Sequence, residues 1–270
     1  MGPIMALILL FEAFYIVNSA RNITVYDPPY RGVICGQQVL HSLQKRAIGG
    51  RDVEEPKYPW TVLIVGPNTR CSGTLISSRH VLTAAHCLTR KILQETRCVH
   101  QHLPTTDIYV YPGSFIFYTG NHVNSYTRHR VVKTTVHPEY LCHNRYCNLA
   151  LAEISPQVGL LGRPICLPNP DEDVQRGDVL KATGFDHQPR RYGDIYQLRE
   201  VNLTISNVDE VNFELHVHDK VGGVCNSDSG GPLFKTNDSK STVVGITSFP
   251  TGCPSEPYHC ICFVKEELSD

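Results

Sequence analysis

Short runs of β-branched and aromatic residues recur along the chain, each bounded by glycine, proline or asparagine. Runs of this kind are typical of β-strands separated by turns. The only candidate for a longer amphipathic helix is Val264–Leu268. Many short strands with turn signals predict an all-β fold built of antiparallel barrels. The predicted strands are Thr61–Val65, Ile108–Tyr111, Phe115–Tyr118, Val131–Val136, Val179–Ala182, Leu198–Ile205 and Thr242–Thr247.

The N-terminal part is different, because residues 3–17 are mostly apolar and are followed by the small residues Ser19 and Ala20. The apolar run is too short to span a bilayer, and Glu12 interrupts it. We therefore interpret residues 1–20 as a secretory signal peptide, with a buried N-terminal helix as the alternative.

A polar segment follows the predicted signal peptide. Residues 21–46 carry two adjacent prolines, show no helical period and end in the dibasic pair Lys45-Arg46. We interpret this segment as an extended pro-segment with a cleavage site at its end. A chain of 270 residues is long enough to bury one large core or two small ones.

Positive and negative charges are mixed along the chain, and the formal net charge is −1. This balance argues against a nucleic-acid partner and against electrostatic binding to a membrane. Eleven cysteines fit an oxidising compartment. N-glycosylation sequons at Asn22, Asn202 and Asn237 agree with a secreted, extracellular protein.

Two short strings carry candidate chemistry. They are Thr83-Ala84-Ala85-His86-Cys87 and Ser227-Asp228-Ser229-Gly230-Gly231-Pro232. A hydroxyl becomes an effective nucleophile when a neighbouring imidazole accepts its proton. His86 and Ser229 therefore provide what serine acyl transfer requires, and we expect neither a cofactor nor a metal.

With several further strings, these motifs resemble the chymotrypsin/trypsin family of serine proteases. The order of base, acid position and nucleophile is the chymotrypsin-type order. The resemblance implies two packed antiparallel β-barrels, at about 47–155 and 160–262, with the active site in the cleft between them. A peptidase domain at 47–264 would leave a short C-terminal stub at 265–270. The further strings are Ala47-Ile48-Gly49-Gly50, Tyr58-Pro59-Trp60, Cys71-Ser72-Gly73-Thr74-Leu75-Ile76, His137-Pro138-Glu139-Tyr140 and Arg163-Pro164-Ile165-Cys166-Leu167-Pro168.

The resemblance makes His86 the base and Ser229 the nucleophile, so that the imidazole would accept the hydroxyl proton and return it to the leaving amine. The backbone N–H groups of Ser227 and Ser229 would form the oxyanion hole. Ser227 stands where the family has glycine, and a side chain resists positive φ by about 1–2 kcal/mol. Loss of one such N–H donor would cost about 2.7–4 kcal/mol of transition-state stabilisation.

Asn148 stands where the family has the aspartate of the triad. An aspartate accepts a proton from the nearer imidazole nitrogen and leaves the farther nitrogen able to act as the base. An amide can donate to the nearer nitrogen instead, and the farther nitrogen then already carries a proton. In the family this exchange costs about 10⁴ in rate, or roughly 5 kcal/mol of barrier, so weak catalysis is expected.

The strings around Arg46 and Asp228 resemble the activation machinery of the family's zymogens. Cleavage after Arg46 by an activating protease would make Ala47 the new amino terminus, and its ammonium group would pair with Asp228. Forming this pair would order the pocket, because an unpaired buried carboxylate is costly.

The resemblance also implies three disulfides: Cys71–Cys87, Cys225–Cys253 and Cys35–Cys166. The first would clamp the His86 loop, and the last would keep the pro-segment attached after cleavage. Five cysteines have no assigned partner, and because this number is odd, one thiol stays unpaired or pairs with another chain. Apart from such a pairing between chains, we expect a monomer. Both Cys142–Cys147 and Cys98–Cys142 are plausible pairs. The unassigned cysteines are Cys98, Cys142, Cys147, Cys260 and Cys262.

The predicted specificity pocket differs from one that selects arginine or lysine. Its floor is Gly223 rather than a carboxylate. Ser248-Phe249-Pro250 replaces the usual Ser-Trp-Gly, and Pro250 has no N–H to pair with a substrate strand. Tyr258 stands where the family has a glycine that lines the pocket, and its side chain would fill that space.

Histidines outside the motifs are weaker candidates. A zinc site needs more ligands at defined spacing than two neighbouring histidines provide, so we interpret the histidine pairs as exposed loop positions. We interpret the cysteines beside His259 as disulfide-bonded. The histidine clusters are His216-Val217-His218, His100-Gln101-His102 and His259-Cys260-Ile261-Cys262.

Three functional hypotheses follow. The first is a secreted serine endopeptidase homologue that cleaves protein or peptide substrates slowly, using Ser229 and His86. The second is a secreted homologue without catalysis that binds a protein partner or substrate through the former cleft. The third is an adhesive or inhibitory secreted module that functions without cleavage at Arg46.

Overall fold

The computed structural model describes thirteen stretches of the chain. At 51–52, 93–94, 97–98, 214 and 259–263 it describes the backbone but not the side chains. The predicted signal peptide, most of the pro-segment and Val264–Leu268 lie outside the described residues. The described residues are 35–38, 51–52, 57–94, 97–119, 127–140, 148–158, 162–169, 173–189, 191, 193–209, 214–218, 229–248 and 259–263.

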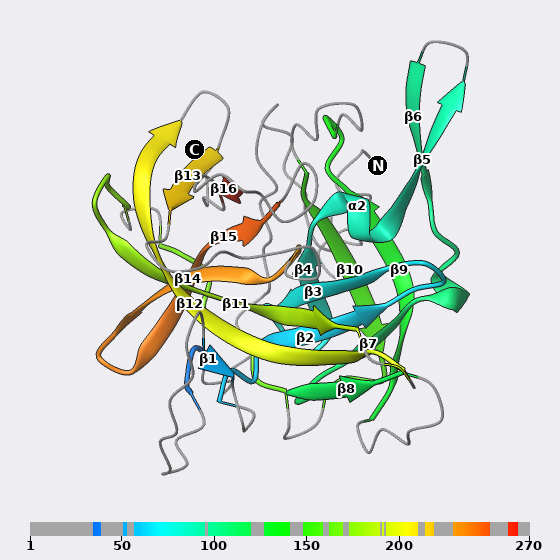
Figure 1. The fold of residues 1–270 in the computed structure, drawn as a ribbon, viewed down its shortest axis with the longest axis horizontal. Helices are drawn as coiled ribbons and strands as arrows, with labels where there is room; N and C mark the ends of the chain where they lie inside the picture. Colours follow the sequence, from blue (N-terminus) through cyan, green and yellow to red (C-terminus); the bar gives the residue numbers. More distant parts are fainter. Residues whose placement is uncertain are drawn as a thin grey trace, which may run out of the picture.

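Six strands close into a first barrel, in the order β10-β4-β3-β2-β7-β9. Every neighbouring pair in this barrel is antiparallel. Figure 1 shows these strands together on one side of the molecule. The strands are β2 (Thr61–Val65), β3 (Arg70–Leu75), β4 (His80–Thr83), β7 (Tyr109–Tyr111), β9 (His129–Val136) and β10 (Ala150–Ser155).

The other large sheet has eight strands, in the order β1-β12-β11-β14-β15-β16-β13, with β8 paired to β12. A further pairing of β12 with β13 closes β12, β11, β14, β15, β16 and β13 into a second cycle. The predicted all-β architecture of two antiparallel barrels is therefore confirmed. The strands are β1 (Arg51–Asp52), β8 (Ile116–Tyr118), β11 (Val179–Gln188), β12 (Ile195–Asp209), β13 (Glu214–His218), β14 (Pro232–Asn237), β15 (Lys240–Thr247) and β16 (His259–Phe263).

The core continues from one barrel to the other. Fully buried Trp60 packs edge-on against Phe234, with 5.4 Å between the ring centroids, and Tyr58 lies 5.6 Å from the same ring. Aromatic pairs of this kind add about 0.5–1.5 kcal/mol to the burial of their area. A second apolar cluster, which includes Leu215 and Val217, fills the second barrel.

A hairpin stands apart from both barrels (Figure 1). It consists of β5 (Thr89–Gln94) and β6 (Arg97–His102) and begins where the short helix α2 (Ala85–Leu88) ends. A single 3₁₀ turn, η1 (Thr105–Asp107), follows it. His100 on the hairpin lies against Tyr140, with 5.2 Å between the rings.

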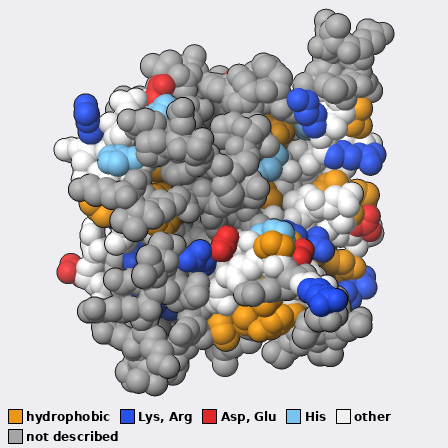
Figure 2. Space-filling view, viewed as in Figure 1, with side chains coloured by type: hydrophobic (Ala, Val, Ile, Leu, Met, Phe, Trp, Pro, Cys, Tyr) orange, Lys and Arg blue, Asp and Glu red, His pale blue; other side chains and the backbone are white. Residues whose placement is uncertain are grey.

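The surface carries mixed charges. On the face seen in Figure 2, acidic and basic side chains of the described residues are interspersed. No helix within the described ranges is long and apolar enough to cross a membrane.

Candidate active site

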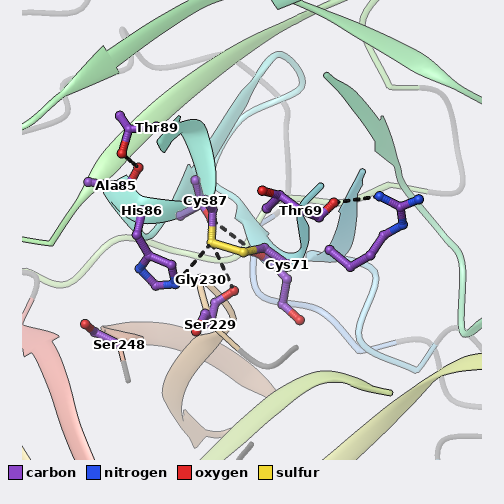
Figure 3. Close-up of a disulfide and its surroundings, with 12 residues drawn as sticks. Thr69, Cys71, Ala85, His86, Cys87, Thr89, Ser229, Gly230 and Ser248 are labelled. Carbon is purple, nitrogen blue, oxygen red and sulfur yellow. Dashed lines mark hydrogen bonds between the residues drawn. A yellow bond between two sulfur atoms is a disulfide. The ribbon is translucent and has the colours of Figure 1, made fainter. Parts of the chain in front are cut away.

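His86 lies on α2, between β4 and the hairpin. A disulfide joins the next residue, Cys87, to Cys71 on β3 and so ties the helix to the first barrel. The hydroxyl of Thr89 donates to the carbonyl of Ala85 at 2.9 Å and closes the end of the short helix. Figure 3 shows this disulfide with His86 and Ser229 close beside it.

Ser229 lies in the turn that precedes β14, and its residue surface is 3% exposed. Its carbonyl accepts the N–H of Ser72 at 2.9 Å, and Gly230 donates to the carbonyl of Thr247 at 2.8 Å. Gly230 has φ +88°, and a Cβ atom there would overlap Thr83 Oγ1 and the carbonyl oxygen of Ser72. Both the backbone angle and the lack of space require glycine after the serine.

The disulfide sulfur of Cys87 lies between the two candidate groups. It is 3.8 Å from Nε2 of His86 and 3.7 Å from the carbonyl oxygen of Ser229. A disulfide sulfur has no proton, so both are packing contacts. The fold thus places His86 and Ser229 against the same disulfide sulfur.

Asn148 is fully buried and lies behind His86. Its Oδ1 accepts the backbone N–H of His86 at 3.1 Å, and its Nδ2 donates to Oγ of Ser248 at 2.7 Å. Nδ2 also lies 2.9 Å from Nδ1 of the His86 ring, whereas Oδ1 lies 3.2 Å from that nitrogen. Because a backbone N–H can only donate, its contact fixes which end of the amide is oxygen.

Among the side chains that the structure describes, one group of three metal-ligand-type residues has its ligand atoms within 4.8 Å of one another. This group is Cys71, His86 and Cys87. Both cysteines of this group are joined in the disulfide. Their sulfurs are not thiolates, so the group cannot serve as a metal centre in this state.

The disulfide Cys35–Cys166 is also present. Around it, Gly36 donates to the carbonyl of Pro164 and accepts the N–H of Ser241, each at 2.8 Å. These bonds attach the described part of the predicted pro-segment, residues 35–38, to Pro164 and to β15.

The sequence predicts Ser248 as a residue of the specificity pocket. In the structure Ser248 is buried and its hydroxyl contacts Asn148, and the prediction did not include this contact. Asn202 and Asn237, in two of the predicted sequons, are exposed. Other predicted site residues lie outside the described ranges, so the oxyanion hole, the activation site and most of the pocket stay predictions. These are Asn22, Arg46, Ala47, Gly223, Cys225, Ser227, Asp228, Phe249, Pro250, Cys253 and Tyr258.

Sequence reasoning missed the residues that support the serine turn. Ser72, Thr83 and Thr247 contact Ser229 or Gly230, yet they are ordinary strand residues in the sequence. Only the close packing of the two barrels identifies them.

Comparison with known proteins agrees with this geometry. Residues 47–264 match the Trypsin family. The chain is 26% identical over 250 residues to phenoloxidase-activating factor 1 of Holotrichia diomphalia, which covers 82% of this chain and 67% of that protein. It is 24% identical over 226 residues to a venom serine protease of Polistes dominula, with 78% of each protein covered. Ovochymase-2 of Mus musculus is 27% identical over 249 residues, which is 81% of this chain but 38% of that protein. The chain belongs to the trypsin family of serine proteases.

Proposed function

We propose that this protein is a secreted trypsin-family endopeptidase homologue that hydrolyses protein or peptide substrates weakly. The observation that carries the proposal is the orientation of the Asn148 amide. Its oxygen is directed to the backbone N–H of His86, and its nitrogen lies 2.9 Å from Nδ1 of the same residue.

The amide has two N–H groups. One donates to Ser248, and the second is available to Nδ1 of His86. If Nδ1 accepts this proton, the neutral ring carries its own proton on Nε2. An Nε2–H cannot take the proton of the Ser229 hydroxyl, so the resting form is inactive.

Turnover then depends on the minor tautomer, which carries its proton on Nδ1. In that form Nε2 accepts the proton as Ser229 Oγ attacks the scissile carbonyl, and the oxyanion is received by the N–H groups of Ser227 and Ser229. His86 next gives the proton to the leaving amine, and water hydrolyses the acyl-enzyme by the same steps. Asn148 has no charge to stabilise the imidazolium, so each proton transfer is slower.

We further infer an extracellular zymogen that is activated by cleavage after Arg46. The disulfide Cys35–Cys166 supports this, because it would hold the released pro-segment on the mature protein. One of the relatives is named a phenoloxidase-activating factor, which supports a protein rather than a small molecule as the target.

A fluorophosphonate probe tests the proposal on the mature protein, cleaved after Arg46. We expect slow labelling of the wild type, labelling about 10³–10⁴ times faster for Asn148→Asp, and none for Ser229→Ala. Equal unfolding midpoints of the three proteins would exclude misfolding as the cause.

Two results would count against weak catalysis. Wild-type labelling as fast as that of Asn148→Asp would show an efficient enzyme. No labelling of either protein would favour the homologue that only binds a protein partner through its cleft.

A further inference from the structure

One row of residues runs across four strands of the first barrel. In the strand register Val65 of β2 lies between Arg70 of β3 and Tyr109 of β7. Arg130 of β9 is opposite Tyr109. Directly opposed residues of antiparallel strands share a face, so these side chains all leave the barrel on one side.

The neighbouring row shows which side this is. Each of its residues is at most 4% exposed, so that row forms part of the barrel core. Successive residues of a strand alternate between faces, which directs the row that contains Arg130 outwards. Arg130 is accordingly exposed, and the other three residues of its row are half-buried. The core row is Cys71, Ile64, Val110 and His129.

A third arginine joins this row from the residues before β9. The guanidinium carbon of Arg128 lies 4.3 Å from the centroid of the Tyr109 ring. Burial raises the pKa of Tyr111, and the nearby guanidinium groups of Arg128 and Arg70 oppose that rise. The three arginines, counting Arg130 opposite Tyr109, are therefore grouped around two tyrosines on the outside of the barrel.

Within the part of the chain that the structure describes, no carboxylate forms an ion pair with Arg70, Arg128 or Arg130. Nη1 of Arg70 instead donates to the carbonyl oxygens of Gly66 and Thr69, at 2.6 and 2.8 Å. Figure 2 shows basic side chains at several places on the side that the first barrel occupies. Between residues 61 and 155 the described basic side chains are Arg70, Arg79, Arg90, Lys91, Arg128, Arg130 and Lys133, and the acidic ones are Asp107, Glu139 and Glu153.

We propose that Arg70, Arg128 and Arg130 bind an acidic segment of a protein partner. Together with Val65 and Tyr109 they form what we call the arginine row. A guanidinium group donates two parallel hydrogen bonds to a carboxylate, which makes arginine well suited to this ligand. The half-buried Val65 and Tyr109 add apolar surface for the methylene groups of glutamate side chains.

The length of the arginine row sets the length of the segment. Neighbouring strands are about 4.7–4.9 Å apart, so the three spacings from Arg70 to Arg130 give roughly 14–15 Å. An extended chain rises about 3.3–3.4 Å per residue, and alternate side chains point to the same side. A segment of about five or six residues, with carboxylates at alternate positions, therefore spans the row.

A protein segment fits this surface better than a sulfated polysaccharide or a nucleic acid. Those polymers gain affinity from many contacts along a continuous line of negative charge. The arginine row offers three cations, and beyond Arg130 it continues with the uncharged Ser155 on β10. The row includes neither His86 nor Ser229, so this inference and the proposed weak catalysis can fail separately.

The test measures binding of a fluorescein-labelled hexaglutamate peptide to the full-length, secreted protein by fluorescence anisotropy at low salt. We expect saturable binding to the wild type that weakens as salt is added. Binding to Arg128→Gln/Arg130→Gln should be at least about tenfold weaker, because charge-assisted hydrogen bonds are lost. The matched control Arg176→Gln/Lys240→Gln removes the same charge from two exposed positions, one before β11 and one on β15, and should keep the wild-type affinity.

A second measurement needs no variant. Phenylglyoxal modifies accessible arginine side chains, and mass spectrometry of the wild type shows which of them hexaglutamate protects. We expect protection of Arg128 and Arg130 but not of Arg176. The proposal is overturned if hexaglutamate does not bind, if the two double variants bind it equally, if Arg128 and Arg130 are not protected, or if heparin binds the arginine row and hexaglutamate does not.

Discussion

Oγ of Ser248 lies 2.7 Å from Nδ2 of Asn148, and this contact joins the two barrels behind the His86 ring. Asn148 precedes β10 of the first barrel, and Ser248 follows β15 of the second. Both residues are buried, so water cannot replace either partner. The contact therefore affects stability as well as the direction in which the amide points.

We expect Ser248→Ala to lower the free energy of unfolding by about 1–3 kcal/mol, because it leaves a buried amide N–H without its acceptor. Urea denaturation at neutral pH measures the change. Thr106→Ala is the control, because that hydroxyl is exposed and bonds only to its neighbour Asp107, so a change of about 0.5 kcal/mol or less is expected. A similar loss in both variants would contradict this account of the contact.

Gly230→Ala should be among the most destabilising single changes in the chain. The new methyl group meets Thr83 and Ser72, and the backbone has φ +88°. We expect a loss of about 4 kcal/mol or more in the free energy of unfolding.

Gly177→Ala is the matched control for that change. Gly177 also has positive φ, +96°, but nothing lies within 4 Å of the added methyl group. Only the backbone cost of about 1–2 kcal/mol remains. If the two variants are equally stable, crowding at Gly230 plays no role.

Acid should weaken the fold through His80. Oγ of Ser77 accepts the N–H groups of Arg79 and His80 at 3.1 Å each, and it lies 2.7 Å from Nδ1 of His80. The hydroxyl therefore donates its own proton to Nδ1. Burial above all, with Arg79 and Lys133 nearby, lowers the pKa of His80 from 6.5 to about 3.

Between these two pKa values the unfolded chain binds a proton that the folded protein does not bind. The free energy of unfolding therefore falls as the pH decreases from about 6.5 towards 3. We expect His80→Gln to show a smaller loss over this interval, measured by urea denaturation at several pH values. Above pH 7, where the ring is neutral in both states, the difference between variant and wild type should no longer depend on pH.

Replacing the disulfide at the His86 helix should lower stability measurably. Cys71 and Cys87 are 16 residues apart, and a loop of this length gives about 3 kcal/mol in the chain-entropy account. We expect Cys71→Ala/Cys87→Ala to lose at least that much, since both buried sulfurs also leave space behind. A loss below about 1 kcal/mol in urea denaturation would mean that the unfolded chain is not constrained by this bond.

The sequence predicted the strands whose residues are mostly β-branched or aromatic. Thr61–Val65 coincides with β2, and Val179–Ala182 is the first part of the longer β11. It did not predict β3, in which Ser72 and Gly73 weaken the local preference for a strand. That strand forms because β2 and β4 pair with its two edges, which is a property of the whole barrel rather than of its own residues.

The site shows the same division between local and distant information. His86 and Ser229 are identified from strings in which each has characteristic neighbours, and Asn148 from the position where the family has the aspartate of the triad. Asn148 and Ser248 are 100 residues apart in the sequence, and no local motif predicts their contact. The pairing of β13 with β16 likewise depends on the register of two strands that are separated by the Ser229 turn.

Strand β8 lies between β7 and β9 in the chain, both of which belong to the first barrel, yet it pairs with β12 in the other sheet. A fragment that contained the first barrel alone would leave the edge of β8 bare and open to other chains. Conversely, a protease that nicked the stretch between the barrels would release nothing, because the two pieces would remain joined by β-sheet pairing and by the shared aromatic core. Split production of the two halves should accordingly yield soluble protein only when both are made together.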